Sequence, residues 1–139
     1  MKYWLIIASK DHVESGKAGG FCQACHGKLW PMEKMHPGDG VLFYSSKEVY
    51  GSSKPYQKFT AAGRIKDDEM YQARMGKDFY PFRRKVKYFA AVDIDIHPLL
   101  DDLHFIDDPH SWGYKLRRGF LEIDGHDFDL VSGIMRKRS

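Results

Sequence analysis

The chain has 139 residues, with 22 Lys+Arg against 19 Asp+Glu and a formal net charge of +3. This length is typical of one domain with its own core, so we expect a single domain over residues 1–139. Hydrophobic residues make up 42% and charged residues 29% of the chain. That composition excludes disorder as the overall state. No apolar run reaches the ~18 residues of a membrane span, so we expect no membrane partner.

The first nine residues briefly imitate a signal peptide, with one positive charge before an apolar stretch. The stretch ends after Ala8 and runs into Lys10-Asp11-His12, which is too short for a secretory hydrophobic region. We expect instead a buried first strand over residues 3–8. With only two cysteines and no export signal, the expected compartment is the reducing cytoplasm. A monomer is the expected oligomeric state.

The N-terminal half predicts strands separated by short helices and polar loops. Ser9 or Asp11 can cap a short helix over residues 12–17, followed by a loop over 21–28. Residues 30–35 predict one helical turn, with Pro31 in its first turn. The Pro-Gly-Asp-Gly stretch at 37–40 predicts a tight turn that leads into a strand over 41–44. A polar loop over 45–54 precedes a strand over 56–65.

The C-terminal half continues the same pattern. We expect a strand over 80–92, which residues 92–96 extend beyond a bulge, and a helical turn over 99–103. A last strand over 119–123 precedes a C-terminal helix that starts near Asp124, with Asp127 placed as in a capping box. Five or six strands with short helices, unequal loops and no βαβ rhythm indicate an α+β fold. We expect a small, mostly antiparallel β-barrel with helical insertions.

The small net charge hides a segregation of charge along the chain. Residues 61–92 carry eight basic and four acidic side chains, whereas residues 93–113 have six aspartates and no Lys or Arg. Alternation along the strand over 80–92 places Arg83, Lys85 and Lys87 on one face. These three residues are candidates for contact with phosphate. The alternative is a solvated strand face that happens to be basic.

The string Cys22-Gln23-Ala24-Cys25-His26 matches the C-x-x-C-H motif of covalent haem attachment. The absence of an export signal and the strand-rich surroundings argue against haem. A zinc site that adds His36 lacks a second C-x-x-C, and a redox dithiol should directly follow a strand at the start of a helix. We therefore expect two loop or pocket-lining thiols, with no metal and no cofactor. A zinc or thiol protein that uses Cys22 and Cys25 remains the alternative from a different class.

Enzymatic chemistry has no positive signal in this sequence. There is no G-x-S-x-G, H-E-x-x-H, Walker A or G-x-G-x-x-G motif. The histidines among the aspartates of residues 93–113 favour a solvated acidic surface over a divalent-ion site. A module that binds a nucleobase requires only aromatic faces and a basic rim. Phe21 is a candidate for such a face, because it follows Gly19-Gly20 and precedes polar Gln23, a poor setting for a core phenylalanine.

Several motifs resemble the EVE domain, a family of the PUA-like superfamily that is related to YTH domains. They span essentially the whole chain, in order: Lys2-Tyr3-Trp4-Leu5-Ile6, Gly20-Phe21, His36-Pro37-Gly38-Asp39 before Phe43-Tyr44, Tyr80-Pro81-Phe82-Arg83, and residues 99–106 before Trp112. The Pro-Gly-Asp turn is shared by PUA-like domains generally. The N-terminal and Tyr-Pro-Phe-Arg motifs point to the EVE family.

The resemblance implies a PUA-like barrel whose pocket binds a modified nucleobase in DNA or RNA, such as N6-methyladenine or 5-methylcytosine. Relatives often carry Trp where this chain has Phe21, the first wall of the pocket, and Cys22 would follow it as a lining residue. The corner Ser9-Lys10-Asp11, often Asn-bearing in relatives, would meet the polar edge of the base. Phe82, Arg83 or Tyr88 would form the opposite wall. An RNA-binding module without modification specificity is the alternative within the same class.

Overall fold

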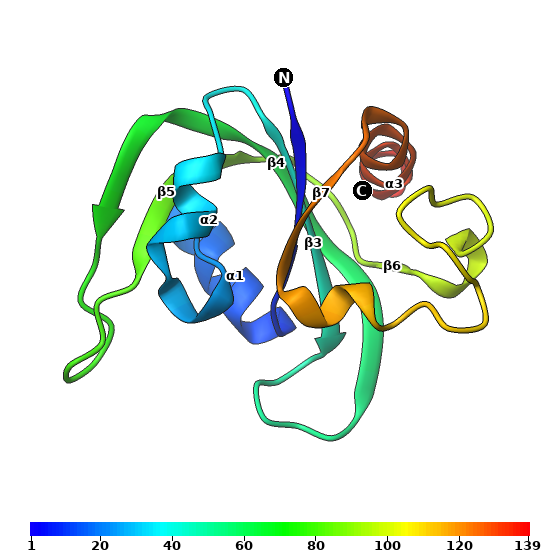
Figure 1. The fold of residues 1–139 in the computed structure, drawn as a ribbon, viewed down its shortest axis with the longest axis horizontal. Helices are drawn as coiled ribbons and strands as arrows, with labels where there is room; N and C mark the ends of the chain where they lie inside the picture. The colour runs from blue at the N-terminus through cyan, green and yellow to red at the C-terminus, as the bar shows by residue number, and fades with distance from the viewer.

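The computed structural model describes the whole chain, residues 1–139 (Figure 1). In chain order, with η marking 3₁₀-helices, its elements are β1 (Tyr3–Ile7), α1 (Lys10–Gly19), β2 (Phe21–Cys22), η1 (Cys25–Gly27), α2 (Leu29–Lys34), β3 (Gly40–Lys47), β4 (Pro55–Gln72), β5 (Phe82–Tyr88), β6 (Ile94–Asp95), η2 (His97–Leu99), η3 (Lys115–Arg118), β7 (Phe120–Ile123) and α3 (Gly125–Lys137). The α+β class is therefore confirmed. None of the helices is long and apolar enough to cross a membrane.

The seven strands form one mixed sheet in the order β2-β5-β4-β3-β1-β7, with β6 paired to β4. Every pairing is antiparallel except that between β1 and β3. The prediction of a barrel is not confirmed, because the end strands β2 and β7 do not pair and the sheet stays open. Side chains bridge this gap instead: the Cys25 thiol lies 3.6 Å from the Arg118 carbonyl oxygen, and Trp30 packs edge-on against Phe120.

Alternation along the central strands produces two apolar cores, one on each face of the sheet. In β1, Leu5 belongs to one core, and its neighbours Trp4 and Ile6 belong to the other. In β3, Leu42 and Val41 divide in the same way. A strand buried on both faces carries an almost continuous apolar run, which explains why these segments were recognisable as strands.

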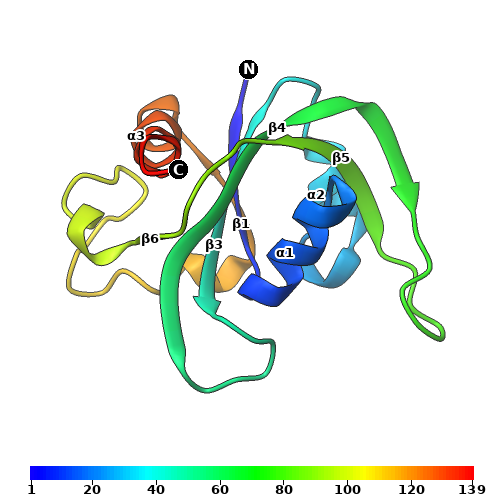
Figure 2. The same cartoon turned by 180° about the vertical axis from the view of Figure 1, so that it is seen from behind.

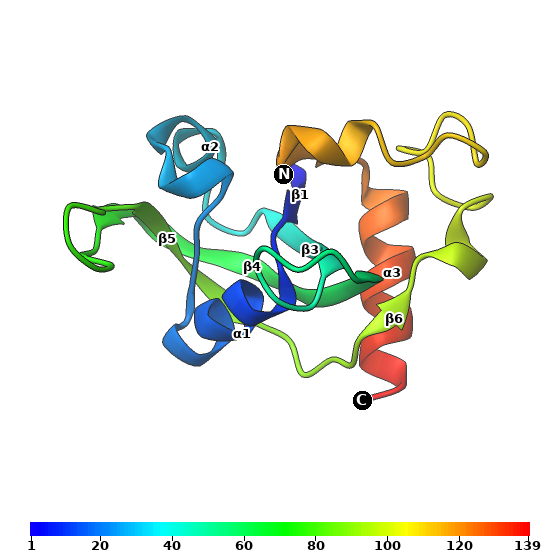
Figure 3. The ribbon, with the colours of Figure 1, turned by 90° about the horizontal axis from the view of Figure 1, so that it is seen from below.

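Helix α3 covers one of these cores, and α1 and α2 cover the other. Phe128, Val131 and Met135 of α3 are buried in the first core. Val13 of α1 and Met32 of α2 are buried in the second. Figures 1 and 3 show α3 on the opposite side of β1 and β3 from α1 and α2. Seen from behind, the long strand β4 curves past β3 and α1 and ends in a projecting hairpin with β5 (Figure 2).

The predicted turn at residues 37–40 is confirmed, and the buried Asp39 carboxylate anchors it. This carboxylate accepts hydrogen bonds from Trp4 Nε1 at 2.9 Å and from the backbone N–H groups of Lys2 at 3.1 Å and His36 at 3.0 Å. Gly38 has φ +87°, which favours glycine. A Cβ on Gly40 would lie 2.6 Å from the Tyr3 ring, so this glycine permits close packing of β1 on β3.

Several element boundaries differ from the predictions. The strand predicted over 80–92 is the shorter β5, and β3 runs through Lys47 into the predicted loop over 45–54. β4 continues seven residues past Ile65, through the polar run 66–72, because its outer part pairs with β5 around a bulge. Residues 94–95 form a separate strand on β4 rather than an extension of β5. The predicted loop at 21–28 begins with strand β2. Short polar strands carry no clear alternation, so their pairing depends on tertiary contacts.

Candidate nucleic-acid interface

A pocket of about 400 Å³ opens between the start of α1, the segment from β2 to η1 and the β4–β5 hairpin. We call it the base pocket, after the nucleobase that the resemblance seen in the sequence leads us to expect there. Its volume lies within the range of roughly 300–1,000 Å³ typical of small-molecule sites. The residues that line it are mostly apolar and include five Phe and Tyr rings besides the two histidines. The lining is Ile7, Ala8, Ser9, His12, Val13, Ser15, Gly16, Phe21, Cys22, Gln23, Ala24, Cys25, His26, Gly27, Phe43, Tyr50, Met75, Phe79, Tyr88 and Gly119.

Phe21 reaches the base pocket because β2 pairs with β5, which sets Phe21 opposite Lys85 in the register. Arg83, two residues before Lys85 and on the same face of β5, covers the Phe21 ring, with its guanidinium carbon 3.7 Å from the ring centroid. Arg83 Nε also donates to the Gln23 side-chain oxygen at 3.0 Å. Arg83, predicted as a phosphate contact or a pocket wall, therefore packs on the wall residue Phe21 and is itself absent from the lining.

Tyr88 forms the floor of the base pocket together with Gly16. The Tyr88 hydroxyl donates to the backbone oxygen of Phe21 at 2.6 Å, which ties β5 to the wall residue. Burial raises the pKa of this phenol well above its usual range, so it remains protonated as a donor. A Cβ on Gly16 would lie 2.6 Å from that same backbone oxygen, so helix α1 can pack here only with a glycine.

Two aromatic residues at the mouth of the base pocket were not singled out from the sequence. The rings of His12 and Tyr50 stack with centroids 5.0 Å apart and planes 22° apart. Asp11 positions this pair, because its carboxylate accepts from the backbone N–H of Tyr50 at 3.3 Å and from that of His12 at 2.9 Å. Burial tends to raise the Asp11 pKa, but these bonds and one from the Ser9 hydroxyl outweigh it and lower the pKa.

The projecting β4–β5 hairpin contributes Met75 and Phe79 to the mouth of the base pocket. Both side chains are exposed. The Met75 sulfur lies 3.7 Å from Arg83 Nη2 and 3.8 Å from Gln23 Nε2, so the hairpin tip contacts the same wall that holds Phe21. Only the tertiary placement of this hairpin assigns these two residues to the pocket, since the sequence shows an ordinary polar turn.

The structure brings four of the predicted pocket residues together and leaves three outside. Ser9, Phe21, Cys22 and Tyr88 line the base pocket, whereas Lys10, Asp11 and Phe82 do not. Phe82 packs against the core that α1 and α2 cover. Asp11 stands behind the lining, where it positions Tyr50 and His12.

Lys10 points away from the base pocket, toward the segment between β5 and β6. Its ammonium group lies 2.6 Å from the Asp93 carboxylate and 3.1 Å from the Tyr56 hydroxyl. The hydrogen bond to Asp93 raises the pKa of Lys10, although burial acts in the opposite direction. This half-buried ion pair ties the start of α1 to β4 and to the segment before β6, so Lys10 is engaged in holding the fold.

Both cysteines are free thiols in the wall of the base pocket. Burial raises the pKa of Cys22 to about 12, and it raises the pKa of the half-buried Cys25 as well. Neither thiol belongs to the one group of side chains close enough to share a metal ion. All five residues of the C-x-x-C-H string line the base pocket, as the interpretation of two pocket-lining thiols predicts.

Of the three residues predicted to contact phosphate, only Lys87 has no ion pair or cation–π partner within the protein. Lys85 pairs with Glu69 at 2.7 Å, and Arg83 covers Phe21. Lys87 is exposed and forms no ion pair. The predicted alternation is confirmed in its other half, because Arg84 and Val86 are buried on the opposite face.

Four potential metal ligands meet at the start of α3, namely His104, Asp124, His126 and Asp127. Their hydrogen bonds explain the arrangement without an ion. The buried Asp127 carboxylate accepts from the backbone N–H groups of His104 and Phe105, and the Asp124 carboxylate accepts from the Asp127 N–H at 2.9 Å. The predicted N-cap is confirmed, but Asp127 fastens the preceding loop instead of bonding back to Asp124.

Comparisons with known proteins agree with these features. A model of the EVE domain matches residues 2–134. A UPF0310 protein of Mycobacterium avium is 47% identical over 135 residues, which cover 97% of this chain and 98% of the relative. A UPF0310 protein of Helicobacter hepaticus is 39% identical over the full length of both chains.

Solved structures of low sequence identity share the fold. The YTH domain of Zygosaccharomyces rouxii MRB1, determined with N6-methyladenosine RNA, superposes with a TM-score of 0.62 at 13% identity, covering 97% of this chain and 86% of the other. The Mmi1 YTH domain, determined with RNA, gives 0.59 at 10% identity, covering 99% and 81%. With the family model matching nearly every residue, the chain belongs to the EVE-domain family.

Proposed function

We propose that this protein binds single-stranded nucleic acid without catalysing a reaction, and that the base pocket holds one modified nucleobase, such as N6-methyladenine or 5-methylcytosine. The observation that carries this proposal is the base pocket itself, a mostly apolar cavity walled by Phe21, Tyr88 and Phe79, with the Arg83 guanidinium over Phe21. A base taken out of its stack needs flat apolar faces and a few polar groups at its edge.

The chemistry of the lining fits a planar ligand with a small apolar substituent. Stacking on aromatic side chains contributes about 1–3 kcal/mol per base. A buried methyl group adds roughly 0.8 kcal/mol where the cavity is apolar. Ser9 and Gln23 supply polar atoms in the lining, which would meet the edge of the base. The hydroxyls of Ser9 and Ser15 bond to Asp11 and the Cys25 thiol bonds to the Arg118 carbonyl oxygen, and none of them bonds to a histidine of the lining, which supports binding rather than catalysis.

The structural neighbours support the same proposal. The MRB1 YTH domain was determined with an RNA that carries N6-methyladenosine, and the Mmi1 YTH domain with RNA. The identity of the preferred modification depends on the side chains that line the pocket of this chain, above all Phe21, His12, Tyr50 and the tip of the β4–β5 hairpin. A module that binds RNA without regard to modification would use the basic surface alone.

Blocking the base pocket separates these two modes of binding. Ser15 is exposed on α1 and lines the pocket, whereas its exposed neighbour Glu14 does not. Ser15→Trp should fill the mouth and abolish the preference for a modified oligonucleotide, with the weaker salt-dependent binding retained. Glu14→Trp adds the same bulk on the same helix and should leave the preference intact. Equal behaviour of the two variants, both folded by circular dichroism, would contradict a role for the pocket.

A further inference from the structure

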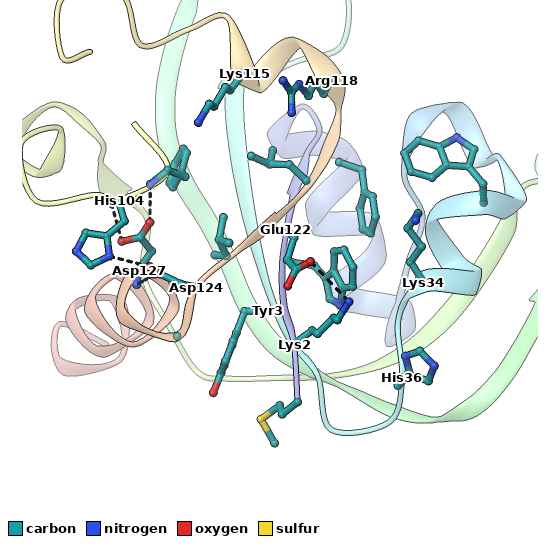
Figure 4. Close-up of a pocket in the computed structure, with 18 residues that line it drawn as sticks. Lys2, Tyr3, Lys34, His36, His104, Lys115, Arg118, Glu122, Asp124 and Asp127 are labelled. Carbon is teal, nitrogen blue, oxygen red and sulfur yellow. Dashed lines mark hydrogen bonds and ion pairs between the residues drawn. The ribbon is translucent and has the colours of Figure 1, made fainter. Parts of the chain in front are cut away.

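A second hollow, which we call the groove, runs along β1 and β7 between α2 and the start of α3 (Figure 4). It measures about 990 Å³ and is wider and more open than the base pocket. The two hollows lie on either side of one short segment, because Gly119 lines the base pocket while its chain neighbours Arg118 and Phe120 line the groove. A strand that places one base in the base pocket needs only to pass this segment to reach the groove.

The unpaired charge in the groove is positive. Among its acidic residues, Asp127 is buried and hydrogen-bonded, Asp124 bonds to His104, and Glu122 lies 3.8 Å from Lys2. These partners appear as dashed lines in Figure 4.

Of the remaining lysines and arginines, Lys115 pairs with Asp107 at 2.8 Å. Lys34 and Arg118 form no ion pair, and they approach the groove from α2 and from η3 (Figure 4). The Arg118 backbone is fixed, since its carbonyl oxygen lies 3.6 Å from the Cys25 thiol.

Trp30 is the exposed aromatic face of the groove. Trp30 is 44% exposed to solvent, a large fraction for a tryptophan. Its edge packs on Phe120 at a centroid distance of 5.6 Å, and Phe120 stacks on Trp4 at 5.0 Å. This aromatic column holds Trp30 in place, so a planar group could stack on it with little ordering of the side chain.

We propose that the groove binds the nucleotides that adjoin the base held in the base pocket, with a neighbouring base stacked on Trp30 and its phosphates in contact with Arg118 and Lys34. This inference rests on the proposed function and extends it from one base to a strand. An exposed aromatic face and two unpaired cations in the same groove match the base and phosphate groups of a single strand. The positive surplus excludes a basic partner, and the fixed indole favours a base over an acidic peptide.

Binding measured against ligand length tests the proposal. The probes are N6-methyladenosine monophosphate and single-stranded RNAs of three, five and seven nucleotides with one central N6-methyladenosine. Wild-type affinity should rise with length. Trp30→Ala should remove about fivefold or more of that gain, with the affinity for the mononucleotide unchanged. Trp30→Phe should restore part of it, and Tyr80→Ala, an exposed aromatic outside both hollows, should match wild type.

Charge variants identify the class of ligand. Arg118→Ala should lower the slope of log affinity against log salt by about 0.7 for the longer RNAs, and Arg138→Ala at the exposed C-terminus should not. Glu122→Gln should strengthen RNA binding, since it removes a negative charge and frees Lys2. A length gain that survives Trp30→Ala and Arg118→Ala, or no gain at all, would overturn the proposal. An acidic peptide that displaces the longer RNAs from the groove would also overturn it.

The length series also separates this inference from the proposed function. Failure of the mononucleotide to bind the folded wild-type protein, with length-dependent RNA binding that still depends on Trp30, would contradict the base pocket and leave the groove. Binding of the mononucleotide without any length gain would do the reverse.

Discussion

The guanidinium of Arg83 covers the ring of Phe21, with 3.7 Å between the guanidinium carbon and the ring centroid. A cation over an aromatic face stabilises by about 0.5–1 kcal/mol when exposed and by more when desolvated. This pairing changes the role expected for Arg83, because a side chain engaged with Phe21 and Gln23 orients the pocket wall before any ligand arrives. The proposed base recognition and the basic strand β5 thus both involve Arg83.

Arg83→Lys should weaken the preference for a modified base while leaving most of the salt-dependent binding. Lysine keeps the charge but lacks the planar group that covers Phe21 and bonds to Gln23. Phe21→Ala should abolish the preference and keep the salt-dependent background. Titrations of modified and plain oligonucleotides check the predictions for Arg83→Lys and Phe21→Ala, with the slope of log affinity against log salt measured for each variant. Loss of preference and background together in a folded Phe21→Ala protein would contradict this division.

Lys87→Ala should reduce the salt slope more than Lys85→Ala does. Lys87 is exposed and unpaired, whereas Lys85 already pairs with Glu69 at 2.7 Å. One lost phosphate contact changes the slope by about 0.7 on a single strand. The same titrations over a salt series measure it. Equal slopes for the two variants would show that the Glu69 pair opens freely when nucleic acid binds.

Asp39 should make the fold sensitive to acid. Burial tends to raise the pKa of its carboxyl, but hydrogen bonds from Trp4, Lys2 and His36 outweigh it and hold the pKa below its usual range. Stability from this depressed pKa is complete above the unfolded value near 4 and is lost as the pH falls through the folded value. Urea unfolding from pH 6 to pH 2 should show this decline. Asp39→Asn should cost about 1–3 kcal/mol at pH 7 and flatten the decline.

Arg84 should be intolerant of lysine. Its guanidinium is buried and donates to the carbonyl oxygens of Met32 at 3.2 Å, Met35 at 2.8 Å and Asp67 at 2.6 Å. It thereby joins the end of α2 to the bulge of β4. An ammonium group cannot span these acceptors, so Arg84→Lys should lower the free energy of unfolding by roughly 2–3 kcal/mol. Chemical denaturation measures this, and an unchanged midpoint would contradict the assignment.

The two thiols should differ in reactivity. Cys25 is half-buried in the pocket wall, and Cys22 is buried with a pKa of about 12. Since the thiolate is the reactive form, a thiol reagent at pH 8 should modify Cys25 slowly and Cys22 only after unfolding. A bound oligonucleotide should slow the reaction at Cys25. Rapid modification of both thiols in the folded protein would argue for an open dithiol and against a pocket wall.

The sequence sufficed for the elements that carry strong apolar patterns. The first strand, the turn at residues 37–40 and the C-terminal helix with its cap at Asp124 all form as predicted. The resemblance to EVE domains was confirmed, and Phe21 and Tyr88 both line the base pocket. These predictions depend on local chemistry or on motifs several residues long.

The features that the sequence did not predict depend on contacts between segments that are distant along the chain. Tyr50 enters the base pocket because Asp11, 39 residues earlier, binds its backbone N–H. Phe79 enters because β4 extends through a polar run that shows no strand alternation. The sheet stays open because its end strands β2 and β7 do not pair. No local pattern encodes such long-range geometry, so these features were found only in the fold.

The most direct test is a titration of the wild-type protein with matched single-stranded oligonucleotides at two salt concentrations. DNA and RNA would each be plain or carry one N6-methyladenine or 5-methylcytosine. We predict a preference for one modified form that persists at the higher salt, because stacking and apolar burial in the base pocket are insensitive to screening. Equal affinity for all forms, collapsing together as salt rises, would contradict base recognition and leave only a basic surface.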